Sequence, residues 1–90
     1  MKRIHVFISG RVHGVCFRAE TWDYARELNL KGWVRNLRDG RVEAIFEGNE
    51  DNVYEIIEWC KKGPPLASVT DLEIIEKPPL GNFTDFTVRY

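Results

Sequence analysis

The sequence predicts an α+β sandwich in which two helices cover one face of an antiparallel sheet. Segments that alternate apolar and polar residues are interleaved with two segments of helical spacing, in the order β-α-β-β-α-β with a short extra strand at the C-terminus. The 90 residues suffice for one hydrophobic core, and a content of 43% hydrophobic and 12% aromatic residues can fill it. Two βαβ halves joined by a hairpin are typical of the ferredoxin-like sandwich. We therefore expect residues 1–90 to form a single domain of this type.

The first three elements are expected to be a strand, a helix and a strand. Apolar residues alternate from Arg3 to Ser9, which predicts a strand that Gly10 ends. The segment from Phe17 to Leu30 has helical spacing, and its apolar face consists of Phe17, Thr21, Tyr24, Ala25 and Leu28. Gly32 begins a second strand, which runs to Leu37.

A hairpin connects this strand to the third strand, and the second helix follows. Asp39-Gly40 is a turn signal in which we expect positive φ at both residues, and Arg41 to Glu47 returns as a strand. Asn49 is the expected N-cap of the second helix, and Gly63-Pro64-Pro65 ends that helix. The apolar stripe of the helix consists of Val53, Ile56, Ile57 and Cys60. The last two strands are expected at Val69 to Glu76 and Phe83 to Tyr90.

Composition excludes several classes of protein. No apolar run approaches the ~20 residues of a membrane span, so no membrane association is expected. Two cysteines do not form the disulfide framework of a secreted domain, which favours a cytoplasmic location, and nothing demands an oligomer rather than a monomer. The net charge of −1 argues against nucleic acid as a partner.

The charges are nevertheless unevenly distributed along the chain. Up to Arg41 there are nine Lys/Arg and four Asp/Glu (9 − 4 = +5), and the remainder has four Lys/Arg and ten Asp/Glu (4 − 10 = −6). A basic first half suits a small anion, although a plain solvated surface would have the same pattern.

The loop from Ser9 to Cys16 is the best candidate for a functional site. Two glycines allow a sharp turn, and the helix that follows begins with unpaired N–H groups and the positive end of its dipole. Together these features favour a bound anion such as phosphate, to which Arg18 would add a guanidinium group. The alternative is a plain turn in which Arg18 pairs with a carboxylate. Walker and GxGxxG patterns are absent.

Cys16 is expected to be a small buried thiol rather than a nucleophile, because it lies only two residues before Arg18. A disulfide between Cys16 and Cys60 is not expected in a reducing compartment. His5 and His13 lack the spacing of metal ligands, so we assign no metal site.

The same residues resemble the acylphosphatase family. The segment Ser9-Gly10-Arg11-Val12-His13-Gly14-Val15-Cys16-Phe17-Arg18 is similar to the family signature G-x-V-Q-G-V-x-F-R, and Lys31 to Val42 is similar to its second signature. The segments Gly63 to Val69 and Phe83 to Tyr90 also match in order and spacing, so that the resemblance covers the whole chain.

The resemblance implies hydrolysis of a small acyl phosphate to a carboxylate and inorganic phosphate, without metal, cofactor or covalent intermediate. It implies that Arg18 binds the phosphate and that Asn36 positions the attacking water. The backbone amides that would hold the phosphate belong to Arg11, Val12, His13, Gly14, Val15 and Cys16. The family usually has Gln where this chain has His13, and a histidine beside a phosphate would add a dependence on pH through its charge.

Three alternatives are weighed against an acylphosphatase. A module that binds a small anion without hydrolysis would need Arg18 but not Asn36. An RNA-binding domain on this scaffold would need exposed aromatic residues on a central strand, where this chain has Glu43 and Glu47. The third is the acylphosphatase-like module of carbamoyl-transferring maturation enzymes.

Overall fold

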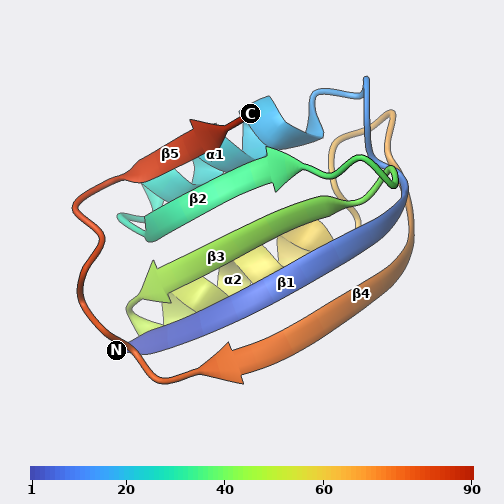
Figure 1. Ribbon diagram of the computed structural model, residues 1–90. Helices are drawn as coiled ribbons and strands as arrows, with labels where there is room; N and C mark the ends of the chain where they lie inside the picture. Colours follow the sequence, from blue (N-terminus) through green and yellow to red (C-terminus); the bar gives the residue numbers. More distant parts are fainter.

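The computed structural model describes residues 1–90 as seven elements around one sheet (Figure 1). The elements are β1 (Lys2–Arg11), α1 (Phe17–Glu27), β2 (Lys31–Asn36), β3 (Val42–Gly48), α2 (Glu50–Cys60), β4 (Ser68–Lys77) and β5 (Phe86–Arg89). Their order confirms the predicted β-α-β-β-α-β arrangement with a short extra strand. None of the helices is long and apolar enough to cross a membrane.

The strands form a five-stranded sheet in the order β4-β1-β3-β2-β5, with both helices on one face (Figure 1). The pairs β1/β3, β1/β4 and β2/β3 are antiparallel, as predicted. The pair β2/β5 differs, because Gly32 to Arg35 lie parallel to Phe86 to Arg89. After β4 the chain crosses the end of the sheet to its opposite edge, so β5 runs in the same direction as β2.

Most element ends lie within two residues of the prediction, but three differ for local reasons. Gly10 does not end β1 as expected, because the strand continues to Arg11 and only its register against β4 shifts between Ser9 and Gly10. Helix α1 ends at Glu27 rather than Leu30, since Asn29 adopts a left-handed conformation with φ of 57°. Strand β5 begins at Phe86 rather than Phe83, because Phe83 packs against the Arg3 guanidinium instead, 4.6 Å from the ring centroid.

The turn between β2 and β3 also departs from the prediction. Only Gly40 has a positive φ, of 97°, so the expected positive φ at Asp39 is wrong. The Gly40 N–H donates to the Leu37 carbonyl, and the Leu37 N–H donates to the Arg41 carbonyl. This pattern is a three-residue loop that ends in a left-handed glycine. The Asp39 carboxylate accepts from the Arg41 N–H at 3.1 Å and so stabilises the turn.

The core lies between the sheet and the helices. The inward residues of β1 and the predicted stripe of α2 are all buried: Ile4, Val6, Ile8, Val53, Ile56, Ile57 and Cys60. Phe46 and Phe86 stack with ring centroids 5.5 Å apart, which attaches β5 to the centre of the sheet. The Asn49 side chain accepts from the Asp51 N–H at 2.9 Å, which confirms the predicted N-cap.

The core also anchors the loop between β1 and α1. Val12 and Val15 are 1% and 4% exposed, whereas His13 and Gly14 between them are exposed. The hydrophobic effect therefore fixes both flanks of the loop beside the end of β2, and leaves its centre on the surface.

Candidate active site

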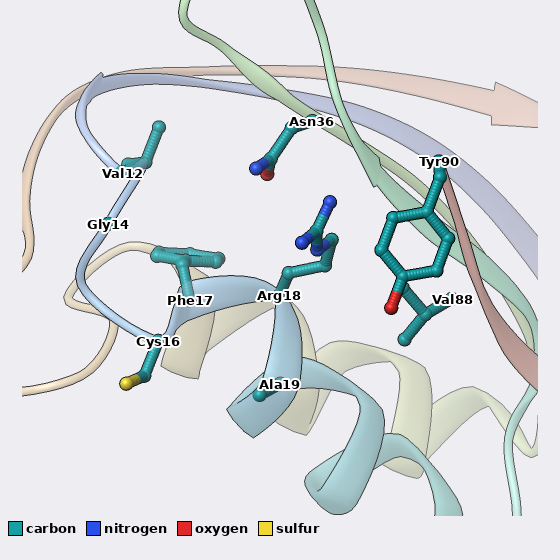
Figure 2. Close-up of a pocket in the computed structure, with 9 residues that line it drawn as sticks. All are labelled: Val12, Gly14, Cys16, Phe17, Arg18, Ala19, Asn36, Val88 and Tyr90. Carbon is teal, nitrogen blue, oxygen red and sulfur yellow. The ribbon is translucent and has the colours of Figure 1, made fainter.

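A pocket of about 240 Å³ lies at the end of the sheet, where four segments meet (Figure 2). The loop after β1, the first turn of α1, the end of β2 and the C-terminal segment line it, through Val12, Gly14, Cys16, Phe17, Arg18, Ala19, Asn36, Val88 and Tyr90. Arg18 is the one formally charged side chain among them, and no lining residue has a carboxylate or imidazole side chain. The pocket therefore suits an anion and offers no strong general acid or base.

The backbone on one side of the pocket carries unpaired N–H donors. Gly14 and Cys16 have φ of 72° and 66°, and these left-handed conformations turn the chain around the pocket. The N–H groups from Val12 to Ala19 donate to no other group of the protein, and the first helical bond is that from the Glu20 N–H to the Cys16 carbonyl, at 3.0 Å. A row of free amides at the positive end of a helix dipole is a favourable environment for phosphate.

Arg18 carries the positive charge into this environment. It is the second residue of α1, as predicted, and it is partly buried. No carboxylate lies within salt-bridge distance, so the alternative of a paired Arg18 is wrong. Its guanidinium lies 4.6 Å from the centroid of the Tyr90 ring, and Figure 2 shows it between that ring and Asn36. The stacked ring orients the guanidinium and leaves its N–H groups free to bind an anion.

Asn36 is the last residue of β2 and faces Arg18 across the pocket (Figure 2). Its side-chain oxygen Oδ1 is buried and is the one buried side-chain nitrogen or oxygen atom of the protein without a hydrogen-bond partner. An unsatisfied buried acceptor costs about 1–3 kcal/mol. The position of Oδ1 in a pocket indicates that it accepts a hydrogen bond from something that enters the pocket.

The structure brings together five of the eight predicted site residues: Val12, Gly14, Cys16, Arg18 and Asn36. Arg11, His13 and Val15 do not line the pocket. Arg11 ends β1 and pairs with Ser68, and the Val15 side chain is buried in the core. The His13 ring binds the Arg41 carbonyl, with Nε2 at 2.8 Å, and so does not place its charge in the pocket as expected.

Cys16 also differs from the prediction. It is exposed rather than buried, because the left-handed backbone turns its side chain outward. Its sulfur points away from Arg18 and Asn36 in Figure 2. Cys16 and Cys60 are both free.

Sequence reasoning missed four residues that line the pocket: Phe17, Ala19, Val88 and Tyr90. Phe17 and Ala19 are the neighbours of Arg18 in the first turn of the predicted helix, so the helix start at Phe17 could have predicted them. Val88 is placed by its parallel pairing with Val34, and Tyr90 follows two residues later. Neither has a local pattern that distinguishes it from any strand residue.

No group of three His, Cys, Asp or Glu side chains could hold a metal ion. The buried Glu43 carboxylate on β3 is held by His5 and Arg35, at 2.7 Å and 2.5 Å.

The chain matches a family and many individual proteins over nearly its full length. The family model described as Acylphosphatase matches residues 4–88. The acylphosphatase of Syntrophobacter fumaroxidans is 53% identical over 89 residues, which are 99% of this chain and 92% of that protein.

Solved structures of other proteins have the same fold as this chain. The acylphosphatase from Bacillus subtilis has a TM-score of 0.95 and 37% identity, with all of both chains covered. HypF from T. kodakarensis has a TM-score of 0.85 and 37% identity, but the chain covers only 12% of that protein. The fold and size of this chain therefore match those of free-standing acylphosphatases as well as one part of a much larger protein.

Proposed function

The chain belongs to the acylphosphatase family and hydrolyses acyl phosphates, and we propose that Arg18 and Asn36 are its catalytic residues. The buried, unpaired Oδ1 of Asn36, opposite an arginine that has no carboxylate partner, is the observation that carries the proposal. A module that only binds an anion has no use for such an acceptor.

Arg18 and the loop amides would bind the phosphoryl group. The free N–H groups of Val12 to Cys16 lie on one side of the pocket, and the guanidinium projects into it from α1. As the transition state forms, negative charge spreads over the non-bridging oxygens, and these donors stabilise it without reorganising. His13 would contribute through its backbone amide only, since its side chain does not line the pocket, and Arg11, which pairs with Ser68 in the sheet, lies outside this row of amides.

Asn36 would orient the water that attacks phosphorus. Its Oδ1 is an acceptor in this role, so it can take a hydrogen bond from water and direct the oxygen lone pair in line with the leaving group. Asn36 is no base, and the water proton passes to a phosphoryl oxygen of the substrate. The P–O bond to the acyl oxygen breaks, and a carboxylate leaves with the bonding electrons.

This chemistry needs neither an acid for the leaving group nor a protein nucleophile. A carboxylate is a good leaving group, so positioning and charge stabilisation supply most of the rate. The outward direction of the Cys16 sulfur argues against a covalent intermediate on that residue. The donor set of the pocket, which is backbone amides and one guanidinium, is suited to a phosphoryl group rather than to a metal ion.

The first test is the hydrolysis of benzoyl phosphate in excess chelator by the wild type, Arg18→Ala and Asn36→Ala. We expect Arg18→Ala to raise KM and lower kcat together, because the lost guanidinium would stabilise both the bound substrate and the transition state. We expect Asn36→Ala to lower mainly kcat, by about 100-fold or more, the usual effect of losing a group that acts on the transition state. Asn36→Asp, which keeps the acceptor but adds a negative charge, is the matched control and should be impaired as well.

An Asn36→Ala enzyme with full activity would overturn the water-positioning role. Unchanged KM in Arg18→Ala would overturn its role in phosphate binding.

We also propose that residues 1–90 act as a single monomeric domain in the cytoplasm. Strands from β1 to β5 form one sheet over one hydrophobic core, which supports a single domain. Two unpaired cysteines are typical of a reducing compartment.

A further inference from the structure

His13 makes a contact that the proposed reaction does not use. Its ring atom Nε2 lies 2.8 Å from the carbonyl oxygen of Arg41. A carbonyl oxygen only accepts hydrogen bonds, so Nε2 carries the proton and donates. The contact joins the loop after β1 to the turn between β2 and β3, which are 28 residues apart in the chain.

The same carbonyl oxygen closes the turn that follows Asn36. The Leu37 N–H donates to the Arg41 carbonyl at 2.8 Å, and Leu37 is the residue directly after Asn36. One oxygen therefore accepts from both sides of the pocket: from the loop that would hold the phosphate and from the turn that fixes the end of β2. A carbonyl has two lone pairs, so it can accept both bonds.

The centre of the loop has no other attachment. No residue from Val12 to Val15 makes a further hydrogen bond with the rest of the protein. Gly14 has no atom within 4 Å of the position that a Cβ would occupy, so packing does not hold it either. Between the buried side chains of Val12 and Val15, the His13 bond alone restrains the backbone amides.

We propose that His13 is a positioning residue whose imidazole N–H holds the phosphate loop in its binding conformation against the β2–β3 turn. This inference rests on the proposed role of the loop in phosphate binding. Ordering the loop before the ligand arrives lowers the entropic cost of binding, so the contact contributes to affinity without touching the substrate.

The contact does not depend on the charge of the ring. Both the protonated ring and the neutral Nε2–H tautomer donate through Nε2. Glutamine can replace this donor, because its Nε2 is separated from Cα by the same number of bonds as Nε2 of histidine. Asparagine is one bond shorter and would not reach the carbonyl.

The test compares His13→Ala, His13→Gln and His13→Asn with the wild type, in two measurements. The first is the affinity for inorganic phosphate, from the dependence of the melting temperature on phosphate concentration, which needs no catalytic activity. The second is KM and kcat for benzoyl phosphate between about pH 5 and 8.

We expect His13→Ala and His13→Asn to weaken phosphate binding and to raise KM by about three- to tenfold, the effect of losing one hydrogen bond. The value of kcat should change less, because β2 and β3 still hold Asn36. His13→Gln should match the wild type at every pH. Since His13 is exposed, melting temperatures without phosphate should agree within about 4 °C.

Equal phosphate affinity in the wild type and His13→Ala would overturn the proposal, as would equal losses in His13→Gln and His13→Ala. Loss of affinity in His13→Gln only at low pH would assign the effect to the charge of the ring instead. Arg18→Ala is measured alongside, because unchanged phosphate affinity in that variant would overturn the proposed site itself. Weaker phosphate binding in Arg18→Ala with no effect in His13→Ala would overturn the positioning role of His13 and leave the proposed phosphate site in place.

Discussion

The two cysteines show how local backbone geometry sets the reactivity of a residue. Cys60 is buried in α2, where burial raises the pKa of its thiol far above the usual range. Cys16 is exposed at the rim of the pocket, because its φ of 66° directs the side chain outward. A thiol reacts as the thiolate and only where a reagent reaches it, so Cys16 and not Cys60 should be modified.

We expect one equivalent of iodoacetamide to modify Cys16 in the folded protein and to leave KM for benzoyl phosphate little changed, because the sulfur points away from Arg18 and Asn36. Inorganic phosphate should not protect the thiol. Mass spectrometry of the modified peptide and assays of the treated protein measure both effects. Modification of Cys60 at a similar rate would contradict the burial of that thiol.

Cys16→Gly is the control variant. It should resist iodoacetamide and remain active, since glycine adopts the left-handed conformation that costs other residues about 1–2 kcal/mol. Its stability should change by less than about 1 kcal/mol, because the released strain is offset by the greater entropy of glycine in the unfolded chain.

At the scale of elements, a buried carboxylate on β3 holds the segment that connects β4 to β5, the strand beside the pocket. Glu47 is 2% exposed and accepts from Arg3 Nε at 2.8 Å, from the Leu80 N–H at 2.9 Å and from the Gly81 N–H at 3.0 Å. Burial alone would raise the pKa of Glu47, but these donors together lower it. Glu47 thereby anchors the crossing between β4 and β5.

We expect Glu47→Gln to destabilise the fold by about 3 kcal/mol, because it leaves the buried Arg3 guanidinium without its charged partner. Denaturant unfolding at neutral pH measures the change. Glu73→Gln, on the exposed outer strand β4, is the matched control and should change the stability by about 0.5 kcal/mol at most.

The lowered pKa of Glu47 also determines whether stability rises or falls with pH. The folded state keeps Glu47 ionised at a pH where the unfolded state, with its usual pKa near 4.5, takes up a proton. The stabilisation is present above about pH 4.5 and is lost as pH falls through the folded pKa. Wild type and Glu47→Gln should therefore converge in stability in acid, and a constant difference would contradict the ionised state of Glu47.

The elements also show what sequence can and cannot predict here. The stripe of α2 and the alternation of β1 follow from local periodicity, and Arg18 and Asn36 follow from a motif on adjoining elements. Tyr90 depends on the parallel pairing of β2 with β5, which is a contact between distant segments. Buried Glu47 reads as an ordinary outward residue of a strand until Leu80 and Gly81 are known to fold over it.

At the scale of the whole molecule, two arginines of the basic first half lie at the pocket end of the sheet without partners. Arg11 ends β1 beside the pocket loop, and Arg38 lies in the turn two residues after Asn36 (Figure 1). Both are exposed and neither has a carboxylate partner. Lys77 ends β4 at the opposite end of the sheet, where it pairs in register with Arg3. Unpaired positive charges near a pocket attract an anion, and dissolved salt weakens this attraction.

We therefore expect KM for an acyl phosphate to rise with ionic strength, and to rise less in the double variant Arg11→Gln/Arg38→Gln. For a dianion at a separation of about 10 Å from each guanidinium, the two charges account for about eightfold in KM at 10 mM salt and about threefold at 0.1 M. Steady-state assays across NaCl concentrations measure the difference, and Lys77→Gln, which removes a charge far from the pocket, should follow the wild type. If all three proteins depended on salt alike, the charge at this end of the sheet would serve solubility alone, and the free amides and Arg18 would account for the entire attraction.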